Sequence, residues 1–201
     1  MKIEEIFGDL PELETERLIL RKITLDDVED MYSYCSNEEV SKYVTWETHQ
    51  TLNDTINFVK FVLNQYENRK IAPWAIECKE NGKLIGTIDF ISWHIEHNIA
   101  EIGYIISKDY WGNGIATEAA NEVIKFGFNH MDLIRIQARC FVENKGSACV
   151  MKKLGMSFEG ILRKSMFIKG KHQNLKMYSI LKEEFSYNHE SKPENVYDMQ
   201  S

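Results

Sequence analysis

The sequence has few cysteines, no long apolar run and no excess of positive charge. Its 201 residues include four cysteines, at positions 35, 78, 140 and 149, and no Cys-x-x-Cys pair. Cysteines scattered in this way are typical of reduced packing residues, so we expect neither a disulfide framework nor a zinc site. No apolar run approaches the length of a membrane span, and no membrane association is expected.

The formal net charge of −7 bears on whether the protein binds nucleic acid. General nucleic-acid binding depends on Lys and Arg contacts to phosphates, so an acidic chain argues against it. The first five residues, Met1-Lys2-Ile3-Glu4-Glu5, do not begin a signal peptide, and a cytoplasmic protein is expected. There are no internal repeats, and the length fits one domain.

The most informative stretch is Tyr110-Trp-Gly-Asn-Gly-Ile-Ala-Thr-Glu118, a glycine-spaced loop that runs into an amphipathic helix. Gly112 and Gly114 let the backbone turn its N–H groups outward, and the helix start adds unpaired donors and partial positive charge. Such a loop can hold a phosphate or pyrophosphate. An Asn-Gly hairpin turn is the alternative. The residues that follow have helical rather than strand periodicity, with one apolar stripe at Ile115, Ala119 and Val123.

The remaining pattern predicts one α/β (α+β) domain. Two helix starts are predicted from Thr24 to Asp27 and from Thr51 to Asp54, each with an acidic residue at the third helical position. The expected order is a strand, two helices, three strands, a helix, a strand, a helix and two strands. We place an N-terminal extension at residues 1–12, the domain at residues 13–185 and a polar tail at residues 186–201.

Several short segments, in one order and spacing, carry a resemblance to a known family. They are Thr15-Glu-Arg-Leu-Ile-Leu-Arg21, Leu84-Ile-Gly-Thr-Ile88, Ala100-Glu-Ile-Gly-Tyr104, Tyr110 to Ala119, Asn144-x-x-Ser147, Lys153-Leu-Gly155 and Glu159-Gly160. Over residues 13–182 the chain resembles the GCN5-related N-acetyltransferase (GNAT) superfamily. The resemblance is to the RimJ/RimL-type branch, which acetylates the N-terminal amines of ribosomal proteins.

The resemblance implies a single GNAT-like domain with acetyl-CoA as co-substrate and no metal. The sheet would be mixed and mostly antiparallel, with about six to seven strands, about four flanking helices and a splayed strand pair at the cofactor site. Backbone groups freed by that splay need partners, and the pantetheine amides would supply them. One freed N–H would polarise the thioester carbonyl. The implied cofactor-binding residues are Ile105, Ile106, Trp111, Gly112, Asn113, Gly114, Ile115, Ala116, Thr117, Asn144 and Ser147.

The expected catalytic residues are Glu101 and Ser147. An attacking amine must be neutral, so a base is expected, and superfamily members often use a carboxylate at the position of Glu101. A structural ion pair is the alternative for Glu101, and Asp89 is a second candidate base. Ser147 would protonate the leaving thiolate. Close relatives in this branch place a base carboxylate after the Glu-Gly step, where this chain has Met166.

The resulting hypothesis is direct acetyl transfer to a primary amine, most favourably a protein or peptide N-terminal α-amine. An α-amino group has a pKa about 2.5 units below that of lysine, which saves ~3.4 kcal/mol of deprotonation. The alternatives are a small-molecule or antibiotic amine as acceptor and a non-catalytic acyl-CoA-binding module. The protein would be a monomer or homodimer. Trp46 is expected either in the acceptor wall or in the core, and His94 and His97 in a solvated loop rather than a metal site.

Overall fold

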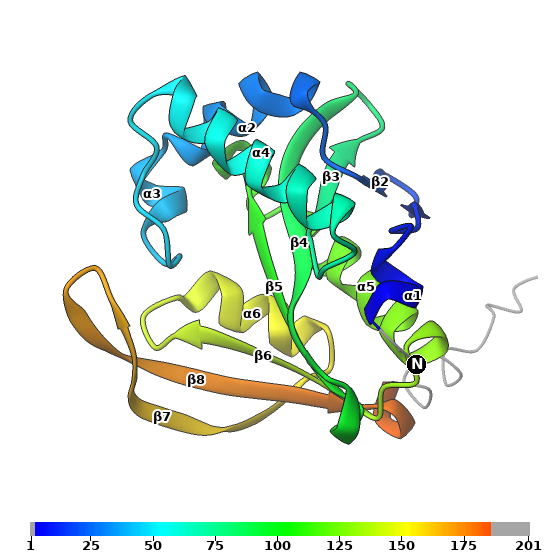
Figure 1. The fold of residues 1–201 in the computed structure, drawn as a ribbon. Helices are drawn as coiled ribbons and strands as arrows, with labels where there is room; N and C mark the ends of the chain where they lie inside the picture. The colour runs from blue at the N-terminus through cyan, green and yellow to red at the C-terminus, as the bar shows by residue number, and fades with distance from the viewer. Residues whose placement is uncertain (1–2, 186–201) are drawn as a thin grey trace, which may run out of the picture.

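The computed structural model describes residues 3–185, which form a single domain around one eight-stranded sheet (Figure 1). The strand order is β1-β2-β3-β4-β5-β6-β8-β7; β5 and β6 are parallel, and the other neighbours are antiparallel. The strands are β1 (Leu13–Glu14), β2 (Leu18–Arg21), β3 (Trp74–Cys78), β4 (Lys83–His94), β5 (Ile99–Ile106), β6 (Arg135–Phe141), β7 (Ser157–Ile168) and β8 (Lys171–Leu181).

Within residues 3–185, six α-helices and three 3-10 helices precede or connect these strands, and residues 182–185 after β8 are also helical. The α-helices are α1 (Ile3–Phe7), α2 (Val28–Cys35), α3 (Glu38–Ser41), α4 (Leu52–Glu67), α5 (Ile115–His130) and α6 (Lys145–Lys153). The 3-10 helices are η1 (Leu25–Asp27), η2 (Ile95–His97) and η3 (Lys108–Tyr110). None of the helices in this range is long and apolar enough to cross a membrane.

The predicted fold class is confirmed, but the sequence underestimated the number of elements. The additional strand is β1, which has two residues, and the additional α-helices are α1 and α3, with five and four. Elements this short do not contain enough residues to show a periodic pattern. The predicted tail, residues 186–201, and the first two residues of the predicted extension lie outside the described residues.

Both predicted helix starts have capping boxes. The amide of Thr24 donates to the Asp27 carboxylate at 2.7 Å, and the amide of Thr51 donates to the Asp54 carboxylate at 2.8 Å. The first box opens η1, which leads directly into α2, and the second opens α4. These boxes satisfy donors that a helix start leaves without partners, and they fix where the two helices begin over the sheet.

The sheet buries apolar side chains on both faces. One face packs against α1, α5 and α6 and contains the fully buried Trp74, Phe90 and Ile102. The other face packs against α2 and α4 and contains Ala75 and Leu84. Since successive residues of a strand point to opposite faces, each central strand contributes to both clusters.

The strands β5 and β6 form a fork. β5 pairs with β4 along its whole length, but its pairing with β6 covers only Ile99, Ala100 and Glu101. Beyond Glu101, β6 continues beside β8, and the two halves of the sheet diverge (Figure 1). A register shift in β4 between Phe90 and Ser92 lies opposite this point. The predicted splayed strand pair is therefore present, and the second half of β5 has no neighbour on its β6 side.

Candidate active site

The glycine loop between η3 and α5 has the conformation that anion binding requires. Gly112 and Gly114 have φ values of 79° and 80°, in the left-handed region that favours glycine. Among the described residues, none lies within 4 Å of a Cβ built on Gly112, and no side chain caps α5. The first-turn amides of Ile115, Ala116 and Thr117 have no intrahelical partner. The loop can therefore take a pyrophosphate on its backbone donors.

An ion pair ties this loop to the segment before β2. The guanidinium of Arg17 donates to the Asn113 carbonyl at 3.0 Å and to the Glu118 carboxylate at 2.7 Å. Glu118 also accepts from the Thr15 hydroxyl at 2.6 Å. Burial acts to raise the pKa of Glu118, but the hydrogen bonds from Thr15 and Arg17 outweigh it and lower that pKa.

Arg17 thus fixes the loop, and its charge is balanced by the Glu118 carboxylate. Sequence reasoning treated Arg17 only as part of a strand motif. Its partner Glu118 is 101 residues away along the chain, so no local pattern could have indicated the pair.

Trp111 closes the end of β5. Its indole N–H donates to the Ile106 carbonyl at 2.8 Å, while the side chain stays 47% exposed. The superfamily motif begins with a polar residue at this position, and here the indole instead connects the loop to the strand. The carbonyl of Ile106 therefore already has a partner. The Ser107 amide donates to the Ile85 carbonyl of β4. Since the hydrogen-bonding side alternates along a strand, the backbone of Ile105 also faces β4, and the N–H of Ile106 faces the fork.

The start of α6 presents Ser147 to the fork. Asn144 is the N-cap of α6, and its side-chain oxygen accepts from the Ser147 amide at 3.0 Å. The Ser147 hydroxyl lies 3.0 Å from the hydroxyl of Tyr104 on β5. Burial raises the pKa of Tyr104 well above its ordinary value, so the phenol stays protonated. Tyr104 is therefore able to donate to Ser147 and hold it in place, a contact that the sequence did not predict.

Glu101 lies where the two strands separate, and it is ion-paired. Its side chain is buried, and its carboxylate accepts from Arg139 Nε at 2.7 Å and from Gln137 Nε2 at 3.2 Å. The ion pair that the sequence left open as an alternative is thus present. Both partners come from β6, so Glu101 joins the two strands just before they diverge.

The second candidate base, Asp89, has a different environment. It lies on β4 opposite Gly103 of β5, half-buried, and no hydrogen-bond or ion-pair partner is found for it within residues 3–185. Burial raises the pKa of Asp89 to about 7. Of the two candidate carboxylates, Asp89 is therefore the one without a cation beside it.

The segment between α3 and α4 forms an aromatic wall next to the α2/α4 cluster. Trp46 is half-buried, with its ring 5.2 Å from that of His49, and His49 lies 6.5 Å from the ring of Phe58 on α4. His49 also shares a 2.8 Å hydrogen bond with Thr55. Burial lowers the pKa of His49, which favours the neutral ring. Ile105 of β5 packs against the same cluster, so Trp46 and Ile105 both lie on the face of the sheet that α2 and α4 cover.

Neither Met166 nor the two histidines His94 and His97 add an ionisable group to the fork. Met166 packs beside Phe141 and Leu175 in a small cluster between β6, β7 and β8. His94 and His97 lie at the other end of β4 and in η2, and the described residues contain no group of three or more candidate metal ligands.

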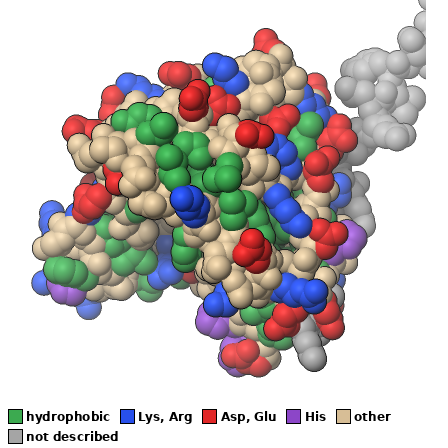
Figure 2. All heavy atoms as spheres, turned by 45° about the horizontal axis from the view of Figure 1, so that its top comes forward, with side chains coloured by type: hydrophobic (Ala, Val, Ile, Leu, Met, Phe, Trp, Pro, Cys, Tyr) green, Lys and Arg blue, Asp and Glu red, His purple; other side chains and the backbone are tan. Residues whose placement is uncertain are grey.

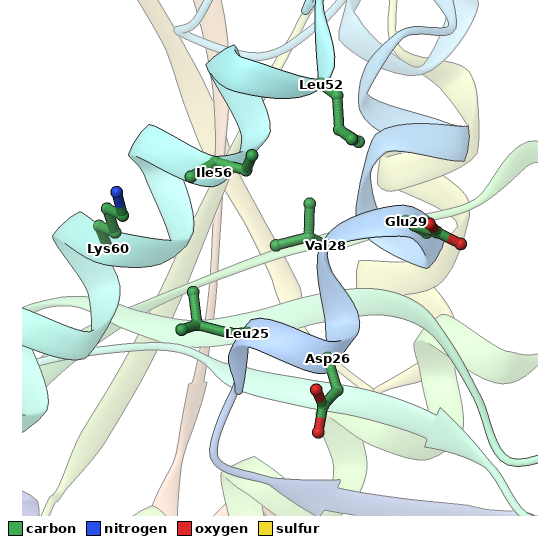
Figure 3. Close-up of a pocket in the computed structure, with 7 residues that line it drawn as sticks. All are labelled: Leu25, Asp26, Val28, Glu29, Leu52, Ile56 and Lys60. Carbon is green, nitrogen blue, oxygen red and sulfur yellow. The ribbon is translucent and has the colours of Figure 1, made fainter.

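A separate surface groove lies between η1, α2 and α4. Figure 3 shows its apolar floor and charged rim, and Figure 2 shows hydrophobic side chains gathered on this face of the molecule. The lining residues are Leu25, Asp26, Val28, Glu29, Leu52, Ile56 and Lys60. None of the predicted coenzyme-binding or catalytic residues contributes to it, so the groove is not part of the candidate active site.

A forked sheet with a glycine loop and an uncapped helix start on one side of the fork fits the architecture of an acyl-CoA-dependent transferase. Comparison with known families agrees with this class. The family model described as "Acetyltransferase (GNAT) domain" matches residues 17–157. The chain therefore belongs to the GNAT acetyltransferase family.

Relatives with assigned names cover most of the chain. The uncharacterized N-acetyltransferase YoaA of Bacillus subtilis is 37% identical over 172 residues, which is 86% of this chain and 97% of YoaA. The spermidine N(1)-acetyltransferase of Escherichia coli K12 is 27% identical over 173 residues, 86% of this chain and 90% of that enzyme. Both names state an N-acetyltransferase and only the second states an acceptor, so these relatives indicate the reaction without fixing the amine.

Solved structures confirm the fold. A GNAT acetyltransferase from Bacillus anthracis superposes with a TM-score of 0.76 at 34% identity, covering 86% of this chain and 99% of that one. The ribosomal L7/L12 α-N-protein acetyltransferase RimL, solved in complex with coenzyme A, superposes with a TM-score of 0.75 at 17% identity, covering 85% and 98%. At this identity the RimL structure shows that the fold is shared.

Proposed function

We propose that this enzyme transfers the acetyl group of acetyl-CoA directly to an N-terminal α-amine of a protein or peptide, as a RimJ/RimL-type acetyltransferase. The observation that carries the donor assignment is the loop from Gly112 to Thr117. It combines two left-handed glycines, an uncapped helix start and the Arg17 guanidinium. These groups fit a pyrophosphate, which needs several donors and positive charge at one place.

The rest of the coenzyme follows the fork in this proposal. The unpaired edge of β5 near Ile106 takes the pantetheine amides, because backbone groups that leave a sheet need new partners. A freed N–H of the same edge polarises the thioester carbonyl. Ser147, held by Asn144 and Tyr104, protonates the departing thiolate.

The acceptor assignment rests on the state of the ionisable groups. Glu101, the carboxylate at the position where superfamily members often have a base, is bound by Arg139. A carboxylate that already neutralises a guanidinium is a weak proton acceptor. Such an enzyme works best on an amine that loses its proton readily, and an α-amine saves ~3.4 kcal/mol relative to lysine.

The second candidate acceptor is a polyamine. It is favoured by the spermidine N(1)-acetyltransferase relative, whose alignment spans 86% of this chain. Spermidine has only aliphatic amines with lysine-like basicity, so its acetylation requires a stronger base than that of an α-amine.

A competition assay separates the two acceptors. The enzyme is given acetyl-CoA near neutral pH with an equimolar mixture of spermidine and a peptide that has a free N-terminus and one internal lysine. Products are located by tandem mass spectrometry, with the N-terminally blocked peptide as control. We expect the peptide α-amine to react at least about tenfold faster than either other amine. Faster acetylation of spermidine would instead assign a polyamine acetyltransferase, and faster lysine acetylation would exclude the α-amine proposal.

A further inference from the structure

The face of the sheet that α2 and α4 cover contains two polar groups without partners, one on α2 and one on β4. Tyr34 of α2 is 2% exposed, and its hydroxyl has no hydrogen-bond partner among the described residues, although it lies beside Thr87. Asp89, two residues further along β4, has none either. Buried polar groups in folded proteins nearly always have partners. Both groups are therefore available to a polar ligand.

The position of these groups relative to the fork suggests which ligand it is. Thr87 lies opposite Ile105, and Asp89 lies opposite Gly103. Both β5 residues belong to the part of the strand that has no β6 neighbour. A Cβ built on Gly103 would lie 3.4 Å from Asp89 Oδ1 and 2.7 Å from Ile91. The glycine thus leaves room for the Asp89 carboxylate at the edge where the thioester is proposed to lie.

We propose that Asp89 is the general base of this acetyltransferase, receiving the proton of the acceptor amine on the face of the sheet opposite Ser147. This inference rests on the proposed acetyl transfer and deepens it. Tyr104 and Gly103 are adjacent on β5, so their side-chain positions point to opposite faces. Ser147 contacts Tyr104 on one face, and Asp89 lies over Gly103 on the other. The acid and the base therefore act from the two sides of the strand.

In the transfer step, one bond forms and one breaks at the thioester carbon, and one proton is lost and one gained. The amine nitrogen forms a bond to the thioester carbonyl carbon, and the carbon–sulfur bond breaks. The proton lost from nitrogen passes to the Asp89 carboxylate and from there to water. The sulfur leaves with its electron pair and takes a proton from the Ser147 hydroxyl, which recovers one from water.

The surroundings of Asp89 suit this role. Burial raises its pKa to about 7, close to the value of about 7.7–8.0 for an α-amine. Proton transfer between groups of similar pKa is close to thermoneutral. Glu101, on the same face of β5, is occupied by Arg139.

The remaining titratable groups around Asp89 are engaged elsewhere. On α4, the Tyr66 hydroxyl donates to the Pro73 carbonyl and accepts from the Ile23 amide. Arg21, whose positive charge acts to lower the pKa of Tyr66, forms ion pairs with Asp27 and Glu77. Tyr34 on α2 is buried and has a pKa raised well above its ordinary value, so it is neutral. Asp89 is thus left free to accept a proton.

The test compares Asp89→Asn with Glu101→Gln and with Glu96→Gln, an exposed carboxylate of η2. The rate of acetyl transfer from acetyl-CoA to a peptide with a free N-terminus is measured across pH, together with acetyl-CoA affinity and melting temperature. We expect Asp89→Asn to lower kcat about 100-fold and to abolish the acidic limb of the pH profile. Acetyl-CoA affinity should stay within about twofold and the fold should remain intact. Glu96→Gln should match the wild type.

The outcomes separate this inference from the proposed function. A wild-type enzyme that acetylates no amine would contradict the proposed function itself. If the wild type is active, retention of the acidic limb in Asp89→Asn overturns the inference. Loss of that limb in Glu101→Gln alone would assign the base to Glu101 instead. A folded Asp89→Asn variant that still binds acetyl-CoA but lacks the acidic limb of the pH profile supports Asp89 as the general base.

Discussion

The two sides of the β5–β6 fork are built in different ways. The donor side is largely one continuous segment, Gly112 to Thr117, in which backbone amides and the start of α5 supply the binding groups. The acceptor side is assembled from β4, α2, α4 and the segment that contains Trp46 and His49. In the proposed function, backbone groups recognise the phosphates that all coenzyme A substrates share, and side chains determine which amine fits. This division explains how relatives of one fold can share a donor and differ in acceptor.

The largest expected effect is on the donor side, from Gly114→Val. A β-branched residue is strained at a φ of 80° and places methyl groups where the phosphates approach. We expect acetyl-CoA affinity, measured by calorimetry, to fall about 100-fold, or about 2.7 kcal/mol. The matched control is Gly82→Val in the β3–β4 turn, where φ is 68° and no described residue lies within 4 Å of a Cβ. Both variants should lose stability, and equal affinities in the two would contradict a phosphate-binding loop.

The next effect concerns the serine on the donor side. Ser147→Ala removes the proposed proton donor to the thiolate, and we expect kcat to fall about 30-fold, or about 2 kcal/mol. Acetyl-CoA affinity should hardly change, because the serine would act mainly in the transition state. Tyr104→Phe keeps the ring but removes the 3.0 Å contact to Ser147, so it should cause a smaller fall of about threefold. Steady-state kinetics with binding measurements would test both, and a loss confined to affinity would refute the acid role.

On the acceptor side, the ionised carboxylate of Asp89 should destabilise the fold. Asp89→Asn should remove that destabilisation. The pKa of Asp89 rises from 3.8 in the unfolded chain to about 7 in the fold, so the folded state holds its proton more tightly. The stability of the wild type therefore decreases as pH rises from about 4 to about 7. Above that window Asp89→Asn should be more stable by about 1–2 kcal/mol, after allowance for partial exposure, and near pH 4 the difference should vanish. Urea unfolding at several pH values would show this, and a uniform difference would refute it.

The smallest effect should come from the ion pair that fixes the loop. Arg17→Gln removes the guanidinium that contacts Asn113 and Glu118, and we expect acetyl-CoA to bind about fivefold more weakly, or about 1 kcal/mol. Part of the lost affinity is electrostatic and should diminish at high salt. The control is Lys125→Gln, which breaks an exposed pair with Glu122 on α5. If the control weakens binding equally, general charge rather than loop positioning is responsible.

The conformation of the glycine loop and of the two helix starts beside the fork could be predicted from the sequence because its signals are local. The glycine spacing of Gly112 and Gly114 and the helical stripe after them lie within a few residues, and the capping pair Asn144 and Ser147 is equally close. The same holds for the capping boxes that position η1 and α4. Short elements such as β1 and α3 were missed because they contain no full period.

The acceptor side depends on contacts between distant residues, which a single sequence does not indicate. The Glu101–Arg139 and Arg17–Glu118 ion pairs join residues 38 and 101 positions apart. Likewise, Asp89 gains its environment from Gly103 across the sheet and from the helices above it. The sequence supplied both carboxylates as candidates, and only the packing distinguished the paired one from the unpaired one.

A crystal structure of the complex with acetyl-CoA would test the central claim most directly. That claim is that the coenzyme enters from the loop and presents its thioester in the fork, with acid and base on opposite faces. We expect the pyrophosphate on the amides of Gly112 to Thr117 and the acetyl carbon beside Gly103 and Ile105, between Ser147 and Asp89. A pyrophosphate bound elsewhere, or an acetyl group outside the fork, would contradict the account.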